Sequence, residues 1–185
     1  MRWIVLLRAV NVGGHGKTPM AELRRALAEA GATDVATYIQ SGNIVLDHPA
    51  EDADAVATHV SDVIEARFGH RPPALAFTPS EIAAVLEGNP YSGPCSGPDS
   101  GSVSDYEPKF VTFHLFRAPP APDAVEALRP RAYPGEEVTL GAQCLYHWPP
   151  KGLGVSKLAP LVPKVLGVTT TARNLNSRQR ILALA

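Results

Sequence analysis

The chain has 185 residues, 45% of them apolar, and a formal net charge of −1, so it can bury the core of one ordinary domain or of two small ones. No apolar run approaches the roughly 20 residues that span a bilayer, and Arg8 interrupts the apolar N-terminal stretch, which argues against a secretory signal. Two distant cysteines and six scattered histidines offer neither a disulfide framework nor zinc-ligand spacing, so we expect a cytoplasmic protein with no metal, no cofactor and no membrane partner.

The chain opens with an apolar strand that leads into a helix. Residues 3–9 are too short and too apolar for a free helix, so they predict a strand. Thr18 can cap a helix that has Pro19 at its first position. An apolar stripe at helical spacing follows, and Gly31 ends it.

A hairpin, a second helix and a further strand come next. Two β-rich runs flank Ser41-Gly42, and glycine supplies the positive φ that a tight turn needs. Residues 52–68 predict a helix, and residues 74–77 predict a strand. The resulting β-α-β-β-α-β order is that of the ferredoxin-like arrangement.

A connecting region divides the chain. Thr78 and Glu81 form a capping box around Pro79, so a short helix should run to about Leu86. Gly, Pro and Ser dominate residues 88–108, which predicts a linker or mobile loop. We therefore divide the chain into an N-terminal subdomain over 1–78, this helix and linker over 79–108, and a C-terminal subdomain with a basic helical tail over 109–185.

The second half repeats the pattern of the first. Residues 109–116 predict a strand, residues 122–128 a helix, and the runs around Gly141-Ala142 a second hairpin. Helices should follow from about Ser156 and from about Asn174. The spacing indicates duplication of one unit. The predicted fold class is α+β, with two ferredoxin-like halves of the βαββα type and antiparallel sheets.

The near-neutral total hides a charge asymmetry. Beyond Glu137 the chain has no acidic residue, so its last 48 residues carry a charge of +6 and the first 137 carry 11 − 18 = −7. This division suggests that the C-terminal part faces an anion. The alternative is that its cations lie on solvated helix faces or pair with the acidic half.

The stretch NVGGHGKT, over residues 11–18, imitates the end of a phosphate-binding P-loop. That pattern has a glycine where this chain has Asn11, and Pro19 marks Thr18 as a helix cap instead of a first-turn residue. A P-loop fold also joins parallel strands through crossover helices, whereas the predicted hairpin is antiparallel. The sequence therefore argues against a P-loop nucleotide hydrolase.

A weaker anion site at the same loop survives this comparison. Gly13 and Gly14 free the backbone next to a predicted helix start, and Lys17 adds positive charge. The alternative is a glycine-rich connection whose lysine is only solvated.

Polar clusters in other predicted loops suggest further ligand contacts. In a duplicated fold these clusters could converge on one cleft between the halves, where amides and cations would bind a phosphate or carboxylate. The alternative is that the hairpin residues serve turn geometry, that Asn174 caps the last helix and that Arg8 is exposed at a strand end. With Asn11, Gly13, Gly14 and Lys17, the candidate ligand-binding residues are Arg8, Gln40, Ser41, Asn43, Ser156, Lys157, Arg173 and Asn174.

Several of these motifs occur in an order that resembles a known family. LLRAVNVGGHGKTPMAELRRAL, TYIQSGNIVL, KFVTFHL, GLGVSKL and TTTARNLNS resemble the uncharacterised bacterial family called domain of unknown function 1697. The resemblance implies an α+β fold with ferredoxin-like halves, and it brings no established activity. Members usually have other residues at Gly16 and Thr18, and often an arginine where this chain has Val155, which would leave one fewer cation for an anion.

Three functional hypotheses follow from the sequence. The first is an uncharacterised protein that binds an anionic ligand, such as a phosphorylated metabolite, a nucleotide or, less favoured, a nucleic acid, in a cleft between the halves. The second is a nucleotide- or phosphoryl-transfer enzyme that uses residues 11–18, and the third is a protein-interaction module. No residue pattern assigns a nucleophile, since Cys95 lies in the predicted linker, so catalytic residues, enzyme activity and oligomeric state stay open.

Overall fold

The computed structural model describes residues 1–13, 16–91, 106–107, 109–121 and 123–185. The chain forms two units, the first comprising Met1–Ala83 with Gln179–Ala185 and the second comprising Ala84–Arg178. Most of the predicted linker, including Cys95, lies outside the described residues.

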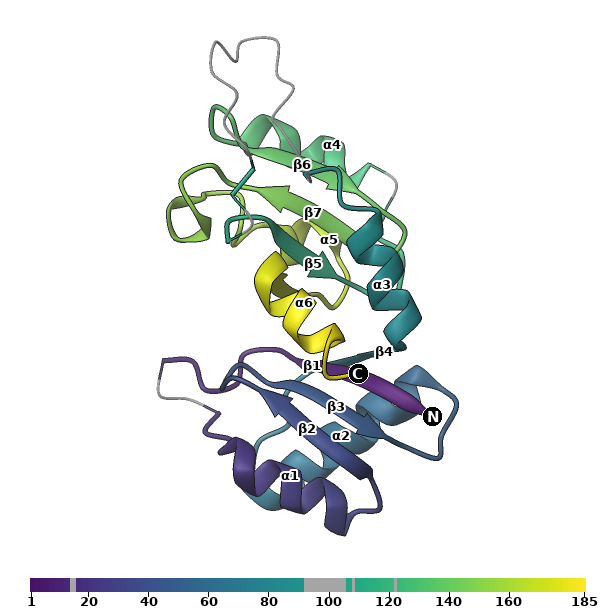
Figure 1. Ribbon diagram of the computed structural model, residues 1–185. Coiled ribbons are helices and arrows are strands. Elements are labelled where there is room, and N and C mark those ends of the chain that lie inside the picture. The colour runs from purple at the N-terminus through teal and green to yellow at the C-terminus, as the bar shows by residue number, and fades with distance from the viewer. Residues whose placement is uncertain (14–15, 92–105, 108, 122) are drawn as a thin grey trace. The chain divides into compact units, whose positions relative to one another are not determined.

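The first unit contains a four-stranded antiparallel sheet in the order β2-β3-β1-β4 (Figure 1). The central strand β1 is apolar after its first residue, from Trp3 to Leu7, and both of its faces are buried there. This explains why its sequence does not alternate between apolar and polar residues. The strands are β1 (Arg2–Leu7), β2 (Thr33–Tyr38), β3 (Asn43–Asp47) and β4 (Ala74–Phe77).

Two helices, α1 (Met20–Glu29) and α2 (Ala53–Phe68), cover one face of this sheet. In α2 the buried Val56, Val60 and Ile64 recur every four residues, so they form one apolar stripe toward the sheet. Asp52 caps this helix by accepting a hydrogen bond from the backbone N–H of Ala55 at 2.7 Å.

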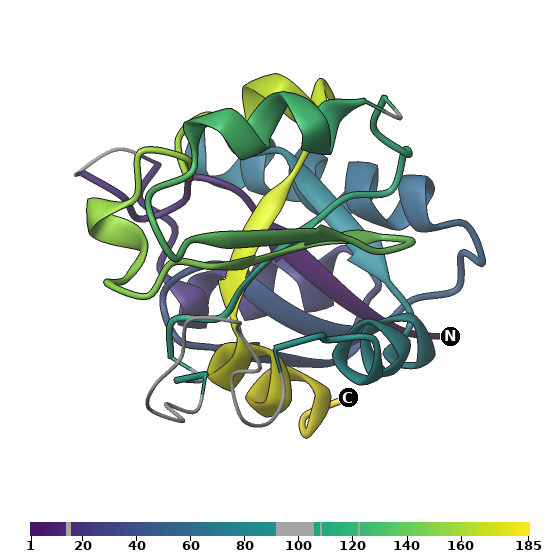
Figure 2. The same cartoon turned by 90° about the horizontal axis from the view of Figure 1, so that it is seen from above.

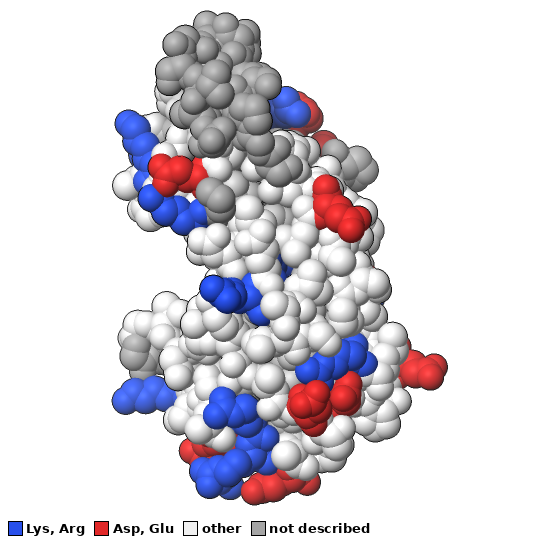
Figure 3. Space-filling model, viewed as in Figure 1, with Lys and Arg blue, Asp and Glu red and all other residues white. Residues whose placement is uncertain are grey.

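Surface charges of the first unit are mixed. Basic and acidic side chains lie close together on its face in Figure 3, and ion pairs join Arg2 to Asp34 at 2.7 Å and Arg67 to Glu22 at 2.8 Å. Some acidic side chains of the N-terminal half are therefore paired with basic side chains of the same half.

The predicted start of α1 is wrong by one residue. Pro19 is the N-cap of the helix, and the helix begins at Met20. Thr18 does not cap it, because its hydroxyl bonds the Gly16 carbonyl at 3.2 Å and His70 Nε2 at 3.0 Å. The capping box of α3 (Pro79–Glu87) is confirmed, since Thr78 and Glu81 exchange hydrogen bonds as predicted.

The second unit contains another antiparallel sheet, in the order β6-β7-β5-β8. The order matches that of the first sheet strand for strand, and two helices again pack on one face (Figure 2). This confirms the α+β class with two halves built on antiparallel sheets. The elements are β5 (Thr112–Leu115), α4 (Ala124–Leu128), β6 (Glu137–Leu140), β7 (Cys144–Trp148), α5 (Val162–Leu166) and β8 (Thr171–Asn174).

Two predictions for the second half are wrong. The helix expected from Ser156 begins only at Val162, because Pro160 lacks the N–H that a helix interior needs, whereas Pro163 lies in the first turn of the helix, where proline is tolerated. Strand β8 was not predicted at all, since Thr171–Asn174 is polar and short. Its antiparallel pairing with β5 provides the structure that local sequence does not indicate. The last helix, α6 (Leu175–Leu182), begins one residue after the predicted start.

Among the described glycines of the first unit, Gly42 is the one at which an added Cβ would lie closest to its neighbours. It has φ +73°, and a Cβ at this position would lie 2.6 Å from Leu7 Cβ and 2.7 Å from Val10 Cγ2. Gly69 also has φ +73°, but a Cβ there would meet nothing within 4 Å. A substitution at Gly69 therefore introduces backbone strain alone, whereas a substitution at Gly42 introduces the same strain together with steric overlap.

We predict that Gly42→Ala lowers the free energy of unfolding by about 3 kcal/mol, from left-handed strain plus overpacking, whereas Gly69→Ala lowers it by about 1 kcal/mol from strain alone. Urea unfolding of the two variants measures the difference. Equal losses would show that the close approach of Leu7 and Val10 does not constrain the hairpin.

Candidate functional site

Asn11 organises the loop that resembles a P-loop. Its Nδ2 donates to the carbonyl oxygens of Thr18 at 3.0 Å and Gln40 at 2.8 Å, and its Oδ1 accepts from the backbone N–H of Thr18 at 2.8 Å. The structure thus brings this loop to the hairpin, but Asn11 uses its amide to join two backbone segments. Lys17 is exposed and Gly13 has φ +60°, while Gly14 lies outside the described residues.

The hairpin residues satisfy the geometry of their own turn. Asn43 is fully buried, and its Nδ2 donates to the Tyr38 carbonyl at 3.0 Å and to Ser41 Oγ at 2.9 Å. Gln40 is exposed, as is Arg8 just beyond the end of β1. These contacts support the turn-geometry alternative, and a ligand role for these residues stays a prediction.

The remaining predicted site residues belong to the second unit. Asn174 caps α6 by accepting from the backbone N–H of Ser177 at 2.9 Å, as the structural alternative predicted. Arg173 lies on β8 and donates to Thr171 Oγ1 at 2.9 Å. Ser156 lines a pocket, and Lys157 lies next to it in the sequence.

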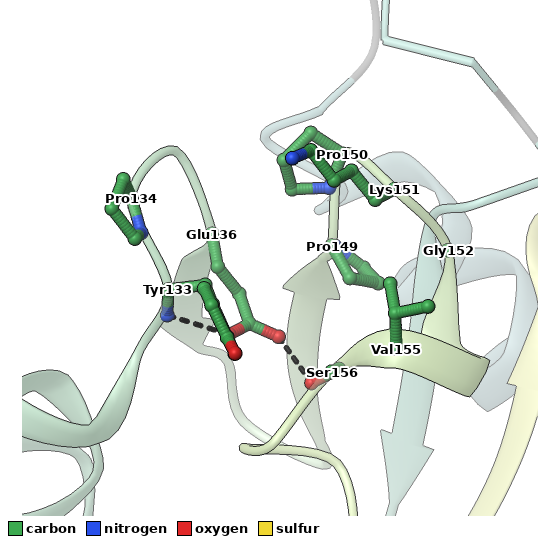
Figure 4. Close-up of a pocket in the computed structure, with 9 residues that line it drawn as sticks. All are labelled: Tyr133, Pro134, Glu136, Pro149, Pro150, Lys151, Gly152, Val155 and Ser156. Atoms are coloured by element: carbon green, nitrogen blue, oxygen red, sulfur yellow. Dashed lines mark hydrogen bonds between the residues drawn. The ribbon is translucent and has the colours of Figure 1, made fainter.

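This pocket has a volume of about 450 Å³ and lies at one end of the β6–β7 hairpin (Figure 4). Glu137 at the start of β6 pairs with Trp148 at the end of β7, so the segments outside these residues meet across the hairpin. The pocket is lined by Tyr133, Pro134, Glu136, Pro149, Pro150, Lys151, Gly152, Val155 and Ser156.

Apolar groups dominate the walls of the pocket. Tyr133 is 47% exposed and Val155 is 61% exposed, although both are large apolar side chains. Lys157 places its Nζ 5.2 Å from the centroid of the Tyr133 ring, and Lys151 is exposed on the other segment. Two cations therefore accompany an exposed apolar surface.

Glu136 is the acidic residue of the pocket lining, and its side chain is only 1% exposed. Its carboxylate accepts hydrogen bonds from the backbone N–H of Tyr133 at 2.9 Å, from His147 Nε2 at 2.8 Å and from the Ser156 hydroxyl. Burial alone would raise the pKa of Glu136, but these three hydrogen bonds outweigh it and lower the pKa. The carboxylate therefore stays ionised while it ties the two segments together.

Ser156 uses its hydroxyl completely within the fold. In addition to donating to Glu136, its oxygen accepts from the backbone N–H groups of Leu158 at 3.1 Å and Ala159 at 2.9 Å. A hydroxyl in this role positions the backbone after the pocket and is poorly placed to act as a nucleophile.

A second histidine extends the network into the core. His147 Nδ1 lies 3.2 Å from His114 Nε2, and both rings are buried. Because the carboxylate can only accept, His147 carries its proton on Nε2, and His114 must then donate from its own Nε2. Burial, with a smaller contribution from His147, lowers the pKa of His114 to about 3. Burial also lowers the pKa of His147 despite its bond to Glu136.

Sequence reasoning missed Glu136, His147 and His114 as a connected group. The available signal was two histidines within otherwise apolar strands, where a polar side chain needs a buried partner. The partner could not be found without the strand pairing. Among the described residues, no group of three His, Cys, Asp or Glu side chains is arranged to hold a metal ion, and no helix is long and apolar enough to cross a membrane.

The protein is an α+β protein made of two ferredoxin-like units. The second unit has a pocket whose lining includes Glu136 of the buried Glu–His–His network. The chain belongs to the family described as protein of unknown function (DUF1697), whose model matches residues 1–146. A conserved bacterial protein, SP0830 from Streptococcus pneumoniae, has a similar solved structure, with a TM-score of 0.62 and 22% sequence identity over 99% of this chain and 97% of that chain. This similarity supports the fold. A comparison with curated proteins gave no match.

The neutral histidine pair predicts a loss of stability in mild acid. The pKa of His114 is about 3 when folded and about 6.5 when unfolded, so between these values the unfolded chain binds more protons. Stability is then complete above pH 6.5 and falls as the pH decreases toward 3. Between pH 7 and pH 5, His114 alone should cost about 2 kcal/mol.

We predict that His114→Gln removes this part of the pH dependence, because glutamine can donate to His147 Nδ1 but does not titrate. Urea unfolding at pH 7 and pH 5 measures the loss for both proteins. If the variant lost as much stability on acidification as the parent, His114 would not be held neutral in the fold.

Proposed function

We propose that the second unit binds a small amphipathic anion, with a planar apolar body and an acidic group, in the pocket between residues 133–136 and 149–156. The observation that carries this proposal is the pairing of an apolar, proline- and tyrosine-lined pocket with Lys151 and Lys157. The sequence led us to expect an anionic ligand of unspecified size, and this proposal restricts that ligand to a molecule that fits the pocket of the second unit.

The size and walls of the pocket support a small molecule. Its volume of about 450 Å³ falls in the range of ordinary ligand pockets, roughly 300–1,000 Å³. The flat faces of Tyr133 and of the prolines suit a planar ring, and Val155 adds apolar area at the opposite segment.

The charge distribution supports an acidic group on that molecule. Lys151 and Lys157 are exposed, whereas the carboxylate of Glu136 is almost fully buried and already accepts three hydrogen bonds. A ligand that enters from solvent therefore meets the two ammonium groups before the carboxylate.

The loop of residues 11–18 offers less support for phosphoryl transfer. Thr18 is fully buried and its hydroxyl is bonded to Gly16 and His70, whereas a P-loop hydroxyl binds Mg²⁺. We therefore place the ligand in the second unit.

We predict that adenosine 5′-monophosphate or salicylate, two planar acids, stabilises the protein and that adenosine binds more weakly because it has no acidic group. At about 100 times the dissociation constant, a ligand of the folded state adds roughly 2.7 kcal/mol of stability, which thermal unfolding detects.

Val155→Glu should weaken binding of either acid about tenfold or more, because it places a carboxylate at an exposed position in the pocket lining. Leu140→Glu is the matched control, since Leu140 is also exposed in the second unit but lies outside the lining. Equal binding by the two variants, or no binding of either acid by the parent, would refute the proposed site.

A further inference from the structure

Arg178 on α6 has a buried charge without a hydrogen-bond partner. The side chain is 0% exposed, and its guanidinium carbon lies 5.2 Å from the centroid of the Phe113 ring. None of its three guanidinium nitrogens has a hydrogen-bond partner in the described part of the chain. A buried charge in this condition is strongly unfavourable, so the site is incomplete as the described residues form it.

The charge of Arg178 persists at neutral pH. Burial lowers its pKa to about 9, which still leaves the guanidinium protonated at pH 7. Its neighbours Cys144 and Tyr146 do not neutralise it, because burial raises the pKa of each to about 12 and both stay uncharged. The cation–π contact with Phe113 stabilises one face of the group but satisfies none of its five N–H donors.

A second guanidinium lies on the same face of the sheet. Arg173 on β8 pairs with Phe113 on β5, so the two side chains project to the same side, and its charge lowers the pKa of Arg178. Burial also lowers the pKa of Arg173 to about 10. Among the described residues no acidic side chain pairs with Arg178, and the sequence has no acidic residue beyond Glu137.

We propose that Arg178, together with Arg173, binds a small oxyanion such as phosphate, sulfate or a carboxylate. The planar guanidinium fork matches two oxygen atoms of such a group, and two adjacent cations favour a full negative charge. Helix α6 begins at Leu175, and the positive end of its dipole adds to the positive potential of the two arginines.

This site is separate from the pocket of the proposed function. Phe113 and Tyr146 alternate along their strands with His114 and His147, so the arginines and the Glu136 network lie on opposite faces of the sheet. The oxyanion also needs no apolar body, because Phe113 already covers the flat face of Arg178. Either site can therefore fail its test without affecting the other.

Inorganic phosphate is the first probe, titrated against the full chain in a buffer of low ionic strength that lacks other oxyanions. At ten times its dissociation constant, phosphate should raise the melting temperature by about 4 °C, and the effect should saturate. Sodium chloride at matched ionic strength should give a smaller, unsaturated change. Sulfate and acetate then show whether a tetrahedral or a planar anion is preferred.

Arg178→Met tests the assignment directly. Without oxyanions this variant should melt at or above the temperature of the parent, because it removes a buried unpaired charge, and phosphate should no longer raise its melting temperature. Arg180→Met, at an exposed position of the same helix, is the matched control and should keep the full response to phosphate.

Two further variants keep the test decisive if Arg178→Met does not fold. Arg178→Lys retains the charge but loses the fork, and Arg173→Met removes the second cation, so each should weaken phosphate binding at least fivefold. The proposal is overturned if phosphate does not stabilise the parent, or if these variants respond to phosphate as the parent does.

Discussion

The buried carboxylate of Glu136 is the interaction on which the second unit's pocket depends. It accepts hydrogen bonds from the segment that enters β6, from His147 on β7 and from Ser156 after β7. The first donor is local, whereas His147 and Ser156 lie 11 and 20 residues away and meet the carboxylate only through the pairing of β6 with β7. Since a buried carboxylate that loses a donor is costly, each donor holds the others in place, and the two walls of the pocket keep a defined separation.

The two units share one topology and differ in what their central strands carry. In the first sheet β1 carries only apolar side chains after Arg2, and the face with Trp3, Val5 and Leu7 packs against α1 and α2. In the second sheet β5 and β7 contribute two histidines to one face and the surroundings of Arg178 to the other. The same scaffold thus supports different chemistry, because the fold sets strand positions and the side chains decide what those positions do.

The loop over residues 11–18 illustrates how a motif can match for structural reasons. Gly13, Gly16 and Asn11 have positive φ, and the Asn11 amide connects the loop to the β2–β3 turn. A glycine at position 11 would lack this amide, so the departure from the P-loop pattern is itself a structural requirement. The loop is therefore joined to the hairpin motif TYIQSGN by the bond from the Asn11 amide to the Gln40 carbonyl.

Local sequence determined most of the elements: the apolar β1, the stripe of α2, the Ser41-Gly42 turn and the capping box at Thr78 all depend on residues close together in the chain. Tertiary structure decided the rest. Strand β8 is polar and exists through its pairing with β5, and the helix predicted from Ser156 begins only at Val162, after Pro160, while that serine bonds Glu136. The candidate site followed the same division. Sequence indicated Ser156, Lys157 and Arg173 from polarity and charge, but the partners Glu136, His147 and Arg178 lie on other elements. Hydrophobic period and capping act over a few residues, whereas burial, pairing and charge compensation depend on which distant residues meet in the folded chain.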